Sequence, residues 1–349
     1  MRSLGADRLI ALLVPFVGLV ILLATIAAAS ASFFYNKAQE ADQASRIALQ
    51  ANVRLRDHVA ILEGVRALYQ SDPDSSGPGF RAYLAALQPQ VQAPGMEGVG
   101  TAIAMRQGTP AAAEERLRAN YGTPIAVWPA TDQPIGFPII LVEPDSPRRD
   151  NALGYDMYSE PVRREAMRRA WQTGRPAASG IVELVQEKSV SRKQPGFLIY
   201  VPVYADAKST APAGGSPSSA PRAGAVVAVA QNARPIEAFV YASFRTHDLM
   251  TALLGSGLEG IEGLEIYAGD GPPAPLVFRH GHVGWDAHEQ RLRVADHQWT
   301  MRISYGRFLE RLGRPLGIFL FGAALALLAT HLDRVHRPRL GAFQALALV

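Results

Sequence analysis

Two long apolar runs stand near the ends of the chain, and shorter apolar segments alternate with polar ones between them. The first run, Leu9–Ala31, is uncharged and as a helix measures about 35 Å at about 1.5 Å per residue, enough to cross the hydrocarbon core of a membrane. The second, Pro315–Leu332, has no Asp, Glu, Lys or Arg and measures about 27 Å by the same rise. The pattern predicts two transmembrane helices, residues 9–32 and 315–332, with residues 33–314 exported between them.

Arginines at the outer ends of both runs predict which way the chain crosses the membrane. They are Arg2, Arg8, Arg334, Arg337 and Arg339. Because basic residues collect on the cytoplasmic side of membrane spans, residues 1–8 and 333–349 are expected in the cytoplasm. Three arginines between residues 307 and 314, on the other side of the second run, weaken this argument. The sequence thus predicts a multi-pass protein of the cell inner membrane whose loop, residues 33–314, lies in the periplasm.

A cleaved signal peptide is the alternative for the first run. Arg2 and Arg8 precede the run and Ala29-Ser30-Ala31 ends it, which is the small-residue pattern of a cleavage site. Against this, the run is longer than the core of a signal peptide, and Phe33–Tyr35 place aromatic side chains where they anchor a span. We therefore expect the first span to be retained.

The first run continues into a region typical of a long helix. Residues 33–71 contain no proline and place Leu55, Val59, Leu62 and Tyr69 near heptad spacing. This apolar stripe has two interpretations: it packs against the chain's own domain, or it forms a coiled coil with a second copy. The second interpretation predicts a homodimer through the stalk helix.

The pattern of residues 138–204 predicts a helix packed on strands. The strands are expected at Pro138–Glu143, Ile181–Val185 and Phe197–Tyr204, the last two as an antiparallel pair. Ser159 is the expected N-cap of the helix, which has Pro161 in its first turn and ends at Gly174. Arg163 and the other arginines of this helix are expected mostly on its polar face.

The remaining segments predict further short elements of an α+β fold. Helices are expected at Phe80–Gln88, Pro110–Tyr121 and Pro235–Phe244, the last followed by a second helix up to Leu254. Strands are expected at Val99–Met105, Gly224–Ala230, Leu264–Tyr267, Leu276–Phe278, Gln290–Ala295 and Trp299–Tyr305, the last two joined by a hairpin with Asp296-His297 at its tip. Residues 205–222 are mostly Ala, Ser, Pro, Gly and Thr, which predicts a flexible projecting loop.

Composition narrows the chemistry that the chain can perform. The formal net charge of the 349 residues is +4 and the arginines are dispersed, which argues against nucleic acid as a partner. There is no cysteine, and therefore no disulfide or thiolate metal site. Four histidines from His280 to His297 lack the spacing of helix-borne metal ligands, and no GxSxG, Walker-type or HExxH motif occurs. We expect no metal, no cofactor and no catalytic residue, and so no enzyme.

Six short motifs lie in order along the chain and together carry a family resemblance. They are Leu62–Leu68, Phe80–Leu84, Glu143-Pro144, Ala152–Asp156, Arg164–Gly174 and Pro202–Tyr204. The combination resembles the CHASE family, the extracytoplasmic sensor domain of bacterial receptors and plant cytokinin receptors. The resemblance implies a stalk helix, residues 33–71, that carries two PAS-like antiparallel-sheet subdomains. The membrane-distal subdomain is expected over residues 72–232 and the membrane-proximal one over residues 233–306.

The resemblance also implies positions for a ligand pocket. Where the cytokinin receptors hold an adenine-like ring with an aspartate, this chain has Arg163, which predicts an anionic small-molecule ligand in place of a base. Met157 and Val185 match the apolar wall of the pocket, and Ser179 and Tyr200 match positions on the strands that follow. A solvated helix face remains the alternative for Arg163, and ordinary sheet core the alternative for Tyr200.

The expected function is signal reception. A small ligand bound outside the cell membrane would shift a two-state equilibrium of the sensor and so signal to a histidine kinase or a nucleotide cyclase-type output. Residues 333–349 are too few for such a domain, so the output is expected in a longer protein or in a partner. The alternative function is a membrane-tethered periplasmic interaction protein without a ligand.

Overall fold

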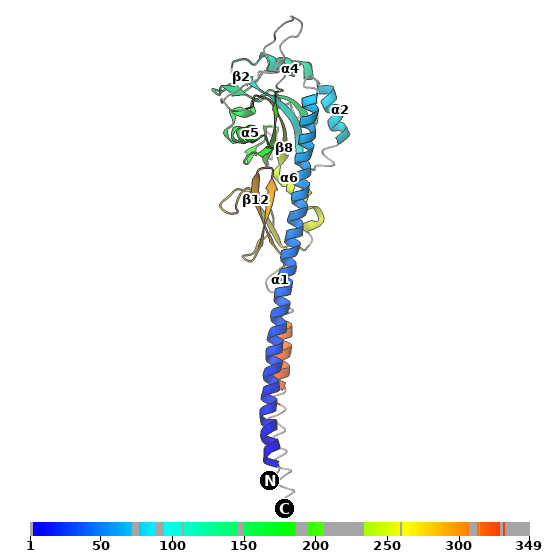
Figure 1. Cartoon of the computed structure of the whole chain (residues 1–349), viewed down its shortest axis with the longest axis vertical. Helices are drawn as coiled ribbons and strands as arrows, with labels where there is room; N and C mark the ends of the chain where they lie inside the picture. The colour runs from blue at the N-terminus through cyan, green and yellow to red at the C-terminus, as the bar shows by residue number, and fades with distance from the viewer. Residues whose placement is uncertain are drawn as a thin grey trace, which may run out of the picture. The chain divides into compact units, whose positions relative to one another are not determined.

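The computed structural model of the chain combines one long helix with antiparallel sheets (Figure 1). It describes residues 3–71, 77–87, 94–106, 108–144, 150–185, 194–205, 234–258, 260–306, 313, 315–328 and 331. The helices are α1 (Ser3–Ser71), α2 (Gly77–Leu87), α4 (Ala111–Tyr121), α5 (Pro161–Thr173) and α6 (Thr246–Leu254), with the short turns η1 (Met157–Ser159) and η3 (Gly255–Leu258). The combination of helices and antiparallel strands confirms the predicted α+β class.

The described strands form sheets of six, four and two strands. The largest sheet contains β1 (Met96–Ile103), β4 (Ile139–Glu143), β5 (Ala177–Ala178), β6 (Val182–Glu183), β7 (Pro195–Tyr204) and β8 (Ile236–Arg245). The second contains β9 (Gly263–Tyr267), β10 (Leu276–Gly281), β11 (His288–Val294) and β12 (His297–Ser304), and β2 (Met105–Arg106) pairs with β3 (Ile135–Gly136). The order of the largest sheet is β4-β1-β8-β7-β5, with β6 also paired to β7, and all of its pairs are antiparallel.

The chain divides into two compact units. One comprises Ser45–Glu259 and Gly263–Ile303, and it contains both of the larger sheets. The other comprises Met1–Ala44, Gly260–Glu262 and Ser304–Val349. Within this second unit, α1 and the helix Pro315–Leu328 pack closely, because a Cβ atom added to Gly322 would overlap the side chain of Thr25.

Among the described residues, α1 is the one helix that is long and apolar enough to cross a membrane. The mean hydropathy of its apolar window is 2.3. The second apolar run is a shorter helix, Pro315–Leu328, in the part that the structure describes. The N-terminal apolar helix indicates a membrane anchor, and the second crossing stays a prediction from the sequence.

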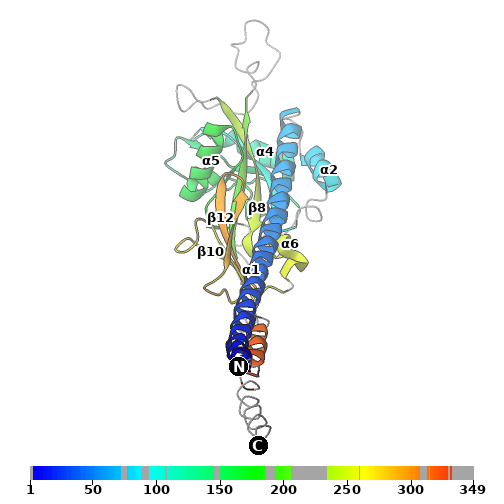
Figure 2. The ribbon, with the colours of Figure 1, turned by 60° about the horizontal axis from the view of Figure 1, so that its bottom comes forward.

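The six-stranded sheet lies between two helical layers (Figure 2). η1 and α5 cover one face, where the hydroxyl of Tyr200 in β7 donates to the sulfur of Met157 at 3.7 Å. α1 covers the opposite face, where the ring of His58 lies 5.7 Å from the ring of Phe244 in β8. Tyr241 in β8 stands directly opposite Tyr200 in the register of the two strands, and it therefore shares the face under α5.

Strand β8 contradicts one of the helices expected from the sequence. The pattern predicts a helix over Pro235–Phe244, but Ile236–Arg245 is a strand paired with β1 and β7. A central strand that is buried on both faces has a continuous apolar run instead of alternation, so periodicity does not separate it from a buried helix. The second helix expected here is present as α6. Residues 236–245 thus belong to the six-stranded sheet and not to the second sheet, to which the expected subdomain 233–306 would assign them.

Other predicted elements agree more closely with the structure. The helices expected at Phe80–Gln88 and Pro110–Tyr121 correspond to α2 and α4. The expected pair Ile181–Val185 and Phe197–Tyr204 is present as β6 and β7, although β6 has only two residues. Apart from Ala205, the loop expected at 205–222 lies outside the described residues, as does the expected strand Gly224–Ala230.

The four-stranded sheet has the order β10-β9-β12-β11. Trp299, Met301 and Ile303 alternate along β12 and are each no more than 1% exposed, which confirms the strand predicted from their spacing. Val294 of β11 pairs with His297 of β12, so Ala295 and Asp296 form a two-residue hairpin turn. The expected hairpin is therefore confirmed, with its turn one residue earlier than the predicted tip Asp296-His297.

The stalk part of α1 buries one face within its own chain. The buried positions are Ala48, Ala51, Leu55, His58, Leu62, Val65 and Tyr69. Their spacing alternates between three and four residues, so the side chains form one stripe along the helix. Leu55 is 3% exposed and Leu62 is fully buried. At these two positions the stripe packs against the chain's own domain, which is the first of the two interpretations of the pattern.

Candidate ligand-binding site

The segment before α5 is held in place by Asp156. Its Oδ1 atom accepts hydrogen bonds from the backbone N–H groups of Phe137, at 2.7 Å, and Tyr158, at 2.9 Å. The carboxylate thereby caps the turn η1 and ties it to the chain next to β3. This arrangement places Met157, the first residue of the turn, in the core, where it is fully buried.

Helix α5 begins one residue later than the pattern suggests. Glu160, not the expected Ser159, is the N-cap, and its carboxylate accepts from the N–H groups of Val162, at 3.0 Å, and Arg163, at 2.8 Å. The hydroxyl of Ser159 instead donates to the carbonyl oxygen of Asp156 at 2.6 Å. A glutamate has a longer reach than a serine, and here it satisfies two of the free N–H groups of the first turn. The expected end of the helix, Gly174, is confirmed by its left-handed φ of 70°.

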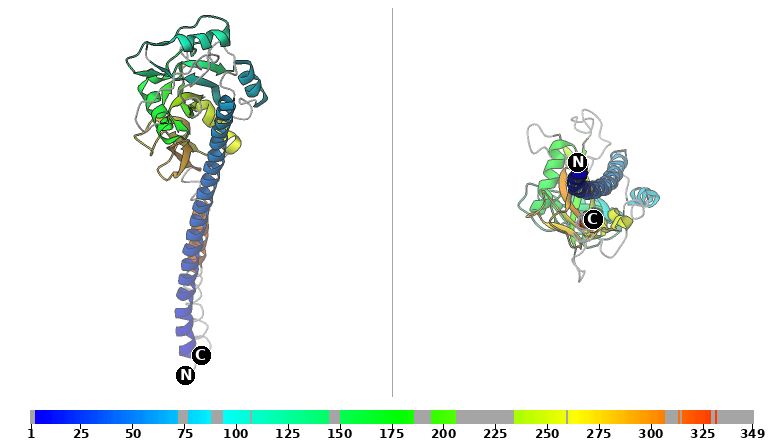
Figure 3. Two further views of the ribbon diagram at one scale, coloured as in Figure 1. Left: turned by 45° about the horizontal axis from the view of Figure 1, so that its top comes forward. Right: turned by 90° about the horizontal axis from the view of Figure 1, so that it is seen from below.

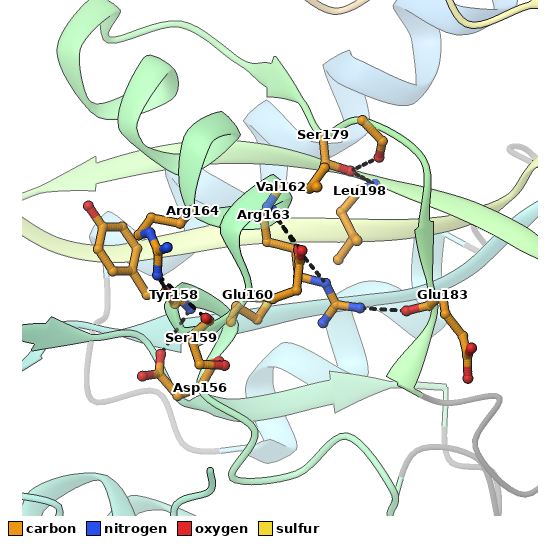
Figure 4. A network of polar contacts seen from close by, with 12 residues as sticks. Asp156, Tyr158, Ser159, Glu160, Val162, Arg163, Arg164, Ser179, Glu183 and Leu198 are labelled. Carbon is orange, nitrogen blue, oxygen red and sulfur yellow. Dashed lines mark hydrogen bonds and ion pairs between the residues drawn. The ribbon is translucent and has the colours of Figure 1, made fainter. Parts of the chain in front are cut away.

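The side chain of Arg163 points toward the backbone of Glu183 (Figure 4) and is buried. Its side chain is 3% exposed, so the interpretation of Arg163 as part of a solvated helix face is wrong. One terminal nitrogen donates to the carbonyl oxygen of Glu183 at 2.8 Å, and the guanidinium lies 5.0 Å from the ring centre of Tyr155. The Glu160 carboxylate is 4.0 Å from Nε, the outer limit of an ion pair. A buried guanidinium therefore faces the sheet under α5.

Two tyrosines of the sheet share this site with Arg163. The rings of Tyr200 and Tyr241 lie 6.4 Å apart on neighbouring strands, and both side chains are fully buried. Burial raises the pKa of each tyrosine, and the nearby guanidinium of Arg163 lowers both values by less than burial raises them. Both hydroxyls are therefore neutral at physiological pH and can donate a hydrogen bond, as that of Tyr200 does to the sulfur of Met157.

Gly100 in β1 makes room for Tyr241. A Cβ atom at Gly100 would stand 2.9 Å from the ring edge and 2.9 Å from the hydroxyl of Tyr241, and it would overlap the carbonyl oxygen of Leu141. The tyrosine ring thus lies across the glycine of the adjacent strand. The close packing explains why this position of β1 has no side chain.

Two buried donors in this group have no hydrogen-bond partner. They are Nε of Arg163 and the hydroxyl of Tyr241. We call Tyr155, Met157, Arg163, Tyr200 and Tyr241 the Arg163 cluster. An unpaired polar atom inside a protein costs about 1–3 kcal/mol, so most such groups have a partner. The two free donors mark the Arg163 cluster as the candidate ligand-binding site.

The structure brings together three of the five site residues expected from the sequence. Met157, Arg163 and Tyr200 belong to the Arg163 cluster. Ser179 is buried, but its hydroxyl already donates to the carbonyl oxygen of Gly180 at 2.7 Å and accepts from the N–H of Leu198 at 2.9 Å. The bond from Leu198 joins Ser179, the residue after β5, to β7. The role of Ser179 visible in the structure is thus structural.

Val185, the fifth expected site residue, is buried, with 6% of its surface exposed. It lies two positions after Glu183, whose carbonyl oxygen accepts a hydrogen bond from Arg163.

Sequence reasoning missed two members of the cluster. Tyr241 lies in the segment expected to be a helix, which concealed its place beside Tyr200. Tyr155 is part of one of the family motifs, so a signal was present, but its contact with Arg163 needs the fold.

Three of the four clustered histidines, His280, His288 and His297, lie on the strands β10, β11 and β12. The described residues contain no group of three or more His, Cys, Asp or Glu side chains that could hold a metal ion. His297 contacts Arg169, with 2.7 Å between its Nε2 and a terminal guanidinium nitrogen.

A cavity of about 530 Å³ lies beside α4 and is lined by Glu114, Glu115 and Arg118 among others. No member of the Arg163 cluster lines this cavity.

Comparison with known proteins places this site within a family domain. The family model described as CHASE domain matches residues 74–278, which is more than half of the chain. The matched range contains all members of the Arg163 cluster and the whole six-stranded sheet, and from the four-stranded sheet it contains β9 and the beginning of β10. No curated protein matches the chain. The chain therefore belongs to the CHASE family, whose domain is an extracellular sensory domain of receptors.

Proposed function

We propose that the chain is a membrane-anchored receptor that binds a small anionic ligand outside the cytoplasm and signals to a histidine kinase or a nucleotide cyclase-type output. Membership of the CHASE family and the apolar N-terminal helix support this proposal. The chain itself acts by binding and not by catalysis. Its 33–314 loop lies in the periplasm, between two spans of the inner membrane.

The observation that carries the ligand proposal is the pair of free donors in the Arg163 cluster. Nε of Arg163 and the hydroxyl of Tyr241 are buried under α5 without an acceptor. A carboxylate offers acceptor oxygens of the kind that both donors lack, and its charge is opposite to that of the guanidinium. Tyr155 and Met157 add apolar surface on which the rest of a small acid packs.

Transmission follows from the continuity of α1. The same helix, Ser3–Ser71, contains the apolar segment and the stalk residues Leu55 and Leu62 that pack in the sensor. A ligand that binds two conformations of the sensor with different affinity changes their populations, and α1 transmits the conformational change toward the membrane.

A homodimer through the stalk would use the exposed Leu49 and Val53, because Leu55 and Leu62 are already buried.

The test is a thermal-shift screen of small carboxylic acids against the full chain in detergent. We expect an acid that raises the melting temperature of the parent and binds at least tenfold more weakly to Arg163→Ala, because a charge-assisted hydrogen bond contributes about 1.5–3 kcal/mol. Tyr241→Phe sharpens the test. Removing a hydroxyl without a partner leaves the free protein as stable as the parent or more stable, yet weakens binding of the acid.

Arg168→Ala is the matched control, because Arg168 lies on the same helix and 53% of its side chain is exposed. This variant should bind the acid as the parent does. If no acid stabilises the parent, or if Arg163→Ala and the control bind equally well, the Arg163 cluster is not the ligand site.

A further inference from the structure

A second cavity lies where the stalk helix meets both larger sheets. Its volume is about 470 Å³, within the usual size range of small-molecule sites. It is lined by Leu55, Arg56 and Val59 of α1, by Arg169, Thr173, Arg175 and Pro176 at the end of α5, and by Arg293, Ala295 and Asp296 of the β11–β12 hairpin. All of these residues belong to the unit that contains both larger sheets, and none belongs to the Arg163 cluster.

The cavity has an excess of positive charge. Four arginines line it against one carboxylate, that of Asp296. This carboxylate is fully engaged: Oδ2 accepts from Nε of Arg169 at 2.9 Å, and Oδ1 accepts from the N–H of Ala178 at 2.7 Å. Arg169 also donates to the carbonyl oxygen of Ala178 at 2.6 Å. The one acidic group thus balances Arg169 and leaves the other three guanidinium groups without a carboxylate in the cavity.

Two of these guanidinium groups have no partner in the part of the chain that the structure describes. The side chains of Arg56 and Arg175 form neither a hydrogen bond nor an ion pair with any described residue. Arg293 has only a 3.3 Å contact from Nε to the carbonyl oxygen of Ala295. Three arginines from α1, from the segment after α5 and from β11 therefore line one cavity.

The wall beside these arginines is fixed by tertiary contacts. Ala295 has a positive φ of 52°, and among the described residues it is the one non-glycine residue with such a conformation. A left-handed alanine is strained, so the turn needs support from its surroundings. The bonds of Asp296 to Arg169 and Ala178 supply that support. The hairpin tip is thus held against α5 and β5, which keeps Arg293 at the cavity.

We propose that this cavity binds a small dianion with an apolar body, such as a dicarboxylate. Planar guanidinium groups match carboxylates with paired hydrogen bonds, and two unpartnered arginines suit two carboxylates. Leu55, Val59 and Pro176 provide an apolar surface for the body of the ligand. The dianion removes the repulsion among the three arginines and holds the stalk to both sheets. It acts at a second site, independent of the Arg163 cluster, and stabilises the arrangement of the sensor in which these elements are close.

The experiment is a thermal-shift and equilibrium titration of the full chain in detergent at constant ionic strength. The probes are terephthalate, its neutral diamide, and sulfate, which is a dianion without an apolar body. We expect terephthalate to raise the melting temperature and to bind at least tenfold more tightly than either comparison compound. The double variant Arg56→Gln/Arg175→Gln should bind terephthalate at least tenfold more weakly than the parent. Both arginines are exposed, so the variant should fold.

Arg168→Gln is the control for loss of one surface charge and should bind terephthalate as the parent does. The proposal is overturned if terephthalate does not stabilise the parent, if sulfate is equally effective, or if the double variant keeps its affinity within twofold.

Discussion

Asp156 has a buried carboxylate whose two oxygens differ in their surroundings. Oδ1 accepts two backbone hydrogen bonds, while Oδ2 is buried without a partner. Burial raises the pKa of Asp156, and the N–H groups of Phe137 and Tyr158 and the charge of Arg164 offset only part of this increase. A raised pKa in the folded state means that folding favours the protonated form. The stability from this residue is therefore fully present below the pKa of the unfolded chain and is lost as pH rises through the folded pKa.

Asp156→Asn tests this pH dependence. The amide keeps an oxygen that accepts from Phe137 and Tyr158 but carries no charge at any pH. We expect the free energy of unfolding to fall less between pH 4 and pH 7 in the variant than in the parent, as measured by urea unfolding. Asp270→Asn, at an exposed side chain, should behave as the parent. Equal pH dependence in Asp156→Asn and the parent would contradict the inferred shift.

At the scale of elements, β1 shows how one strand shapes the candidate site. Gly100 lies under Tyr241, whereas Gly98, two residues earlier on the same face, has more space. A Cβ atom at Gly98 would stand 3.4 Å from its nearest neighbours, the carbonyl oxygen of Glu143 and a methyl group of Val142. The two glycines therefore form a matched pair for one substitution.

We expect Gly100→Ala to reduce the free energy of unfolding by about 1–3 kcal/mol, because the new methyl group overpacks the backbone of β4 and the Tyr241 ring. Gly98→Ala should cost clearly less. Denaturant unfolding of both variants measures the difference. If Gly100→Ala is as stable as Gly98→Ala, Tyr241 does not lie against β1 as the structure shows.

At the scale of the whole molecule, the predicted topology assigns each part of the chain to one side of the membrane. The chain has no cysteine, so a single introduced cysteine is a unique label. Trp285 is 82% exposed and belongs to the expected periplasmic loop, and Gln344 belongs to the expected cytoplasmic tail. These two positions report on the two sides of the second predicted span.

Trp285→Cys should react with a membrane-impermeant maleimide in cells whose inner membrane is intact. Gln344→Cys should react only after the inner membrane is permeabilised, because the positive-inside rule places the tail in the cytoplasm. Mass shifts on a denaturing gel measure both reactions. Equal labelling of the two variants in intact cells would refute the two-span topology.

The sequence by itself determined the features that depend on neighbours along the chain. Three local signals are the charge-free run from Leu9, the helix end at Gly174 and the alternation from Trp299 to Ile303. The structure confirms the helix α1, the end of α5 and the strand β12. The order of short motifs also indicated the CHASE family, which the family model confirms. Periodicity and capping act over a few residues, so they can be read without the fold.

Only the tertiary structure decided the features that depend on distant partners. β8 is a strand because β1 and β7 pair with both of its edges, and burial on both faces removes the alternation that would predict it. Arg163 is buried because its guanidinium donates to the carbonyl oxygen of Glu183 and lies over the ring of Tyr155. Burial of a charged side chain is favourable only where such partners converge, and that convergence is a property of the fold and not of the local sequence.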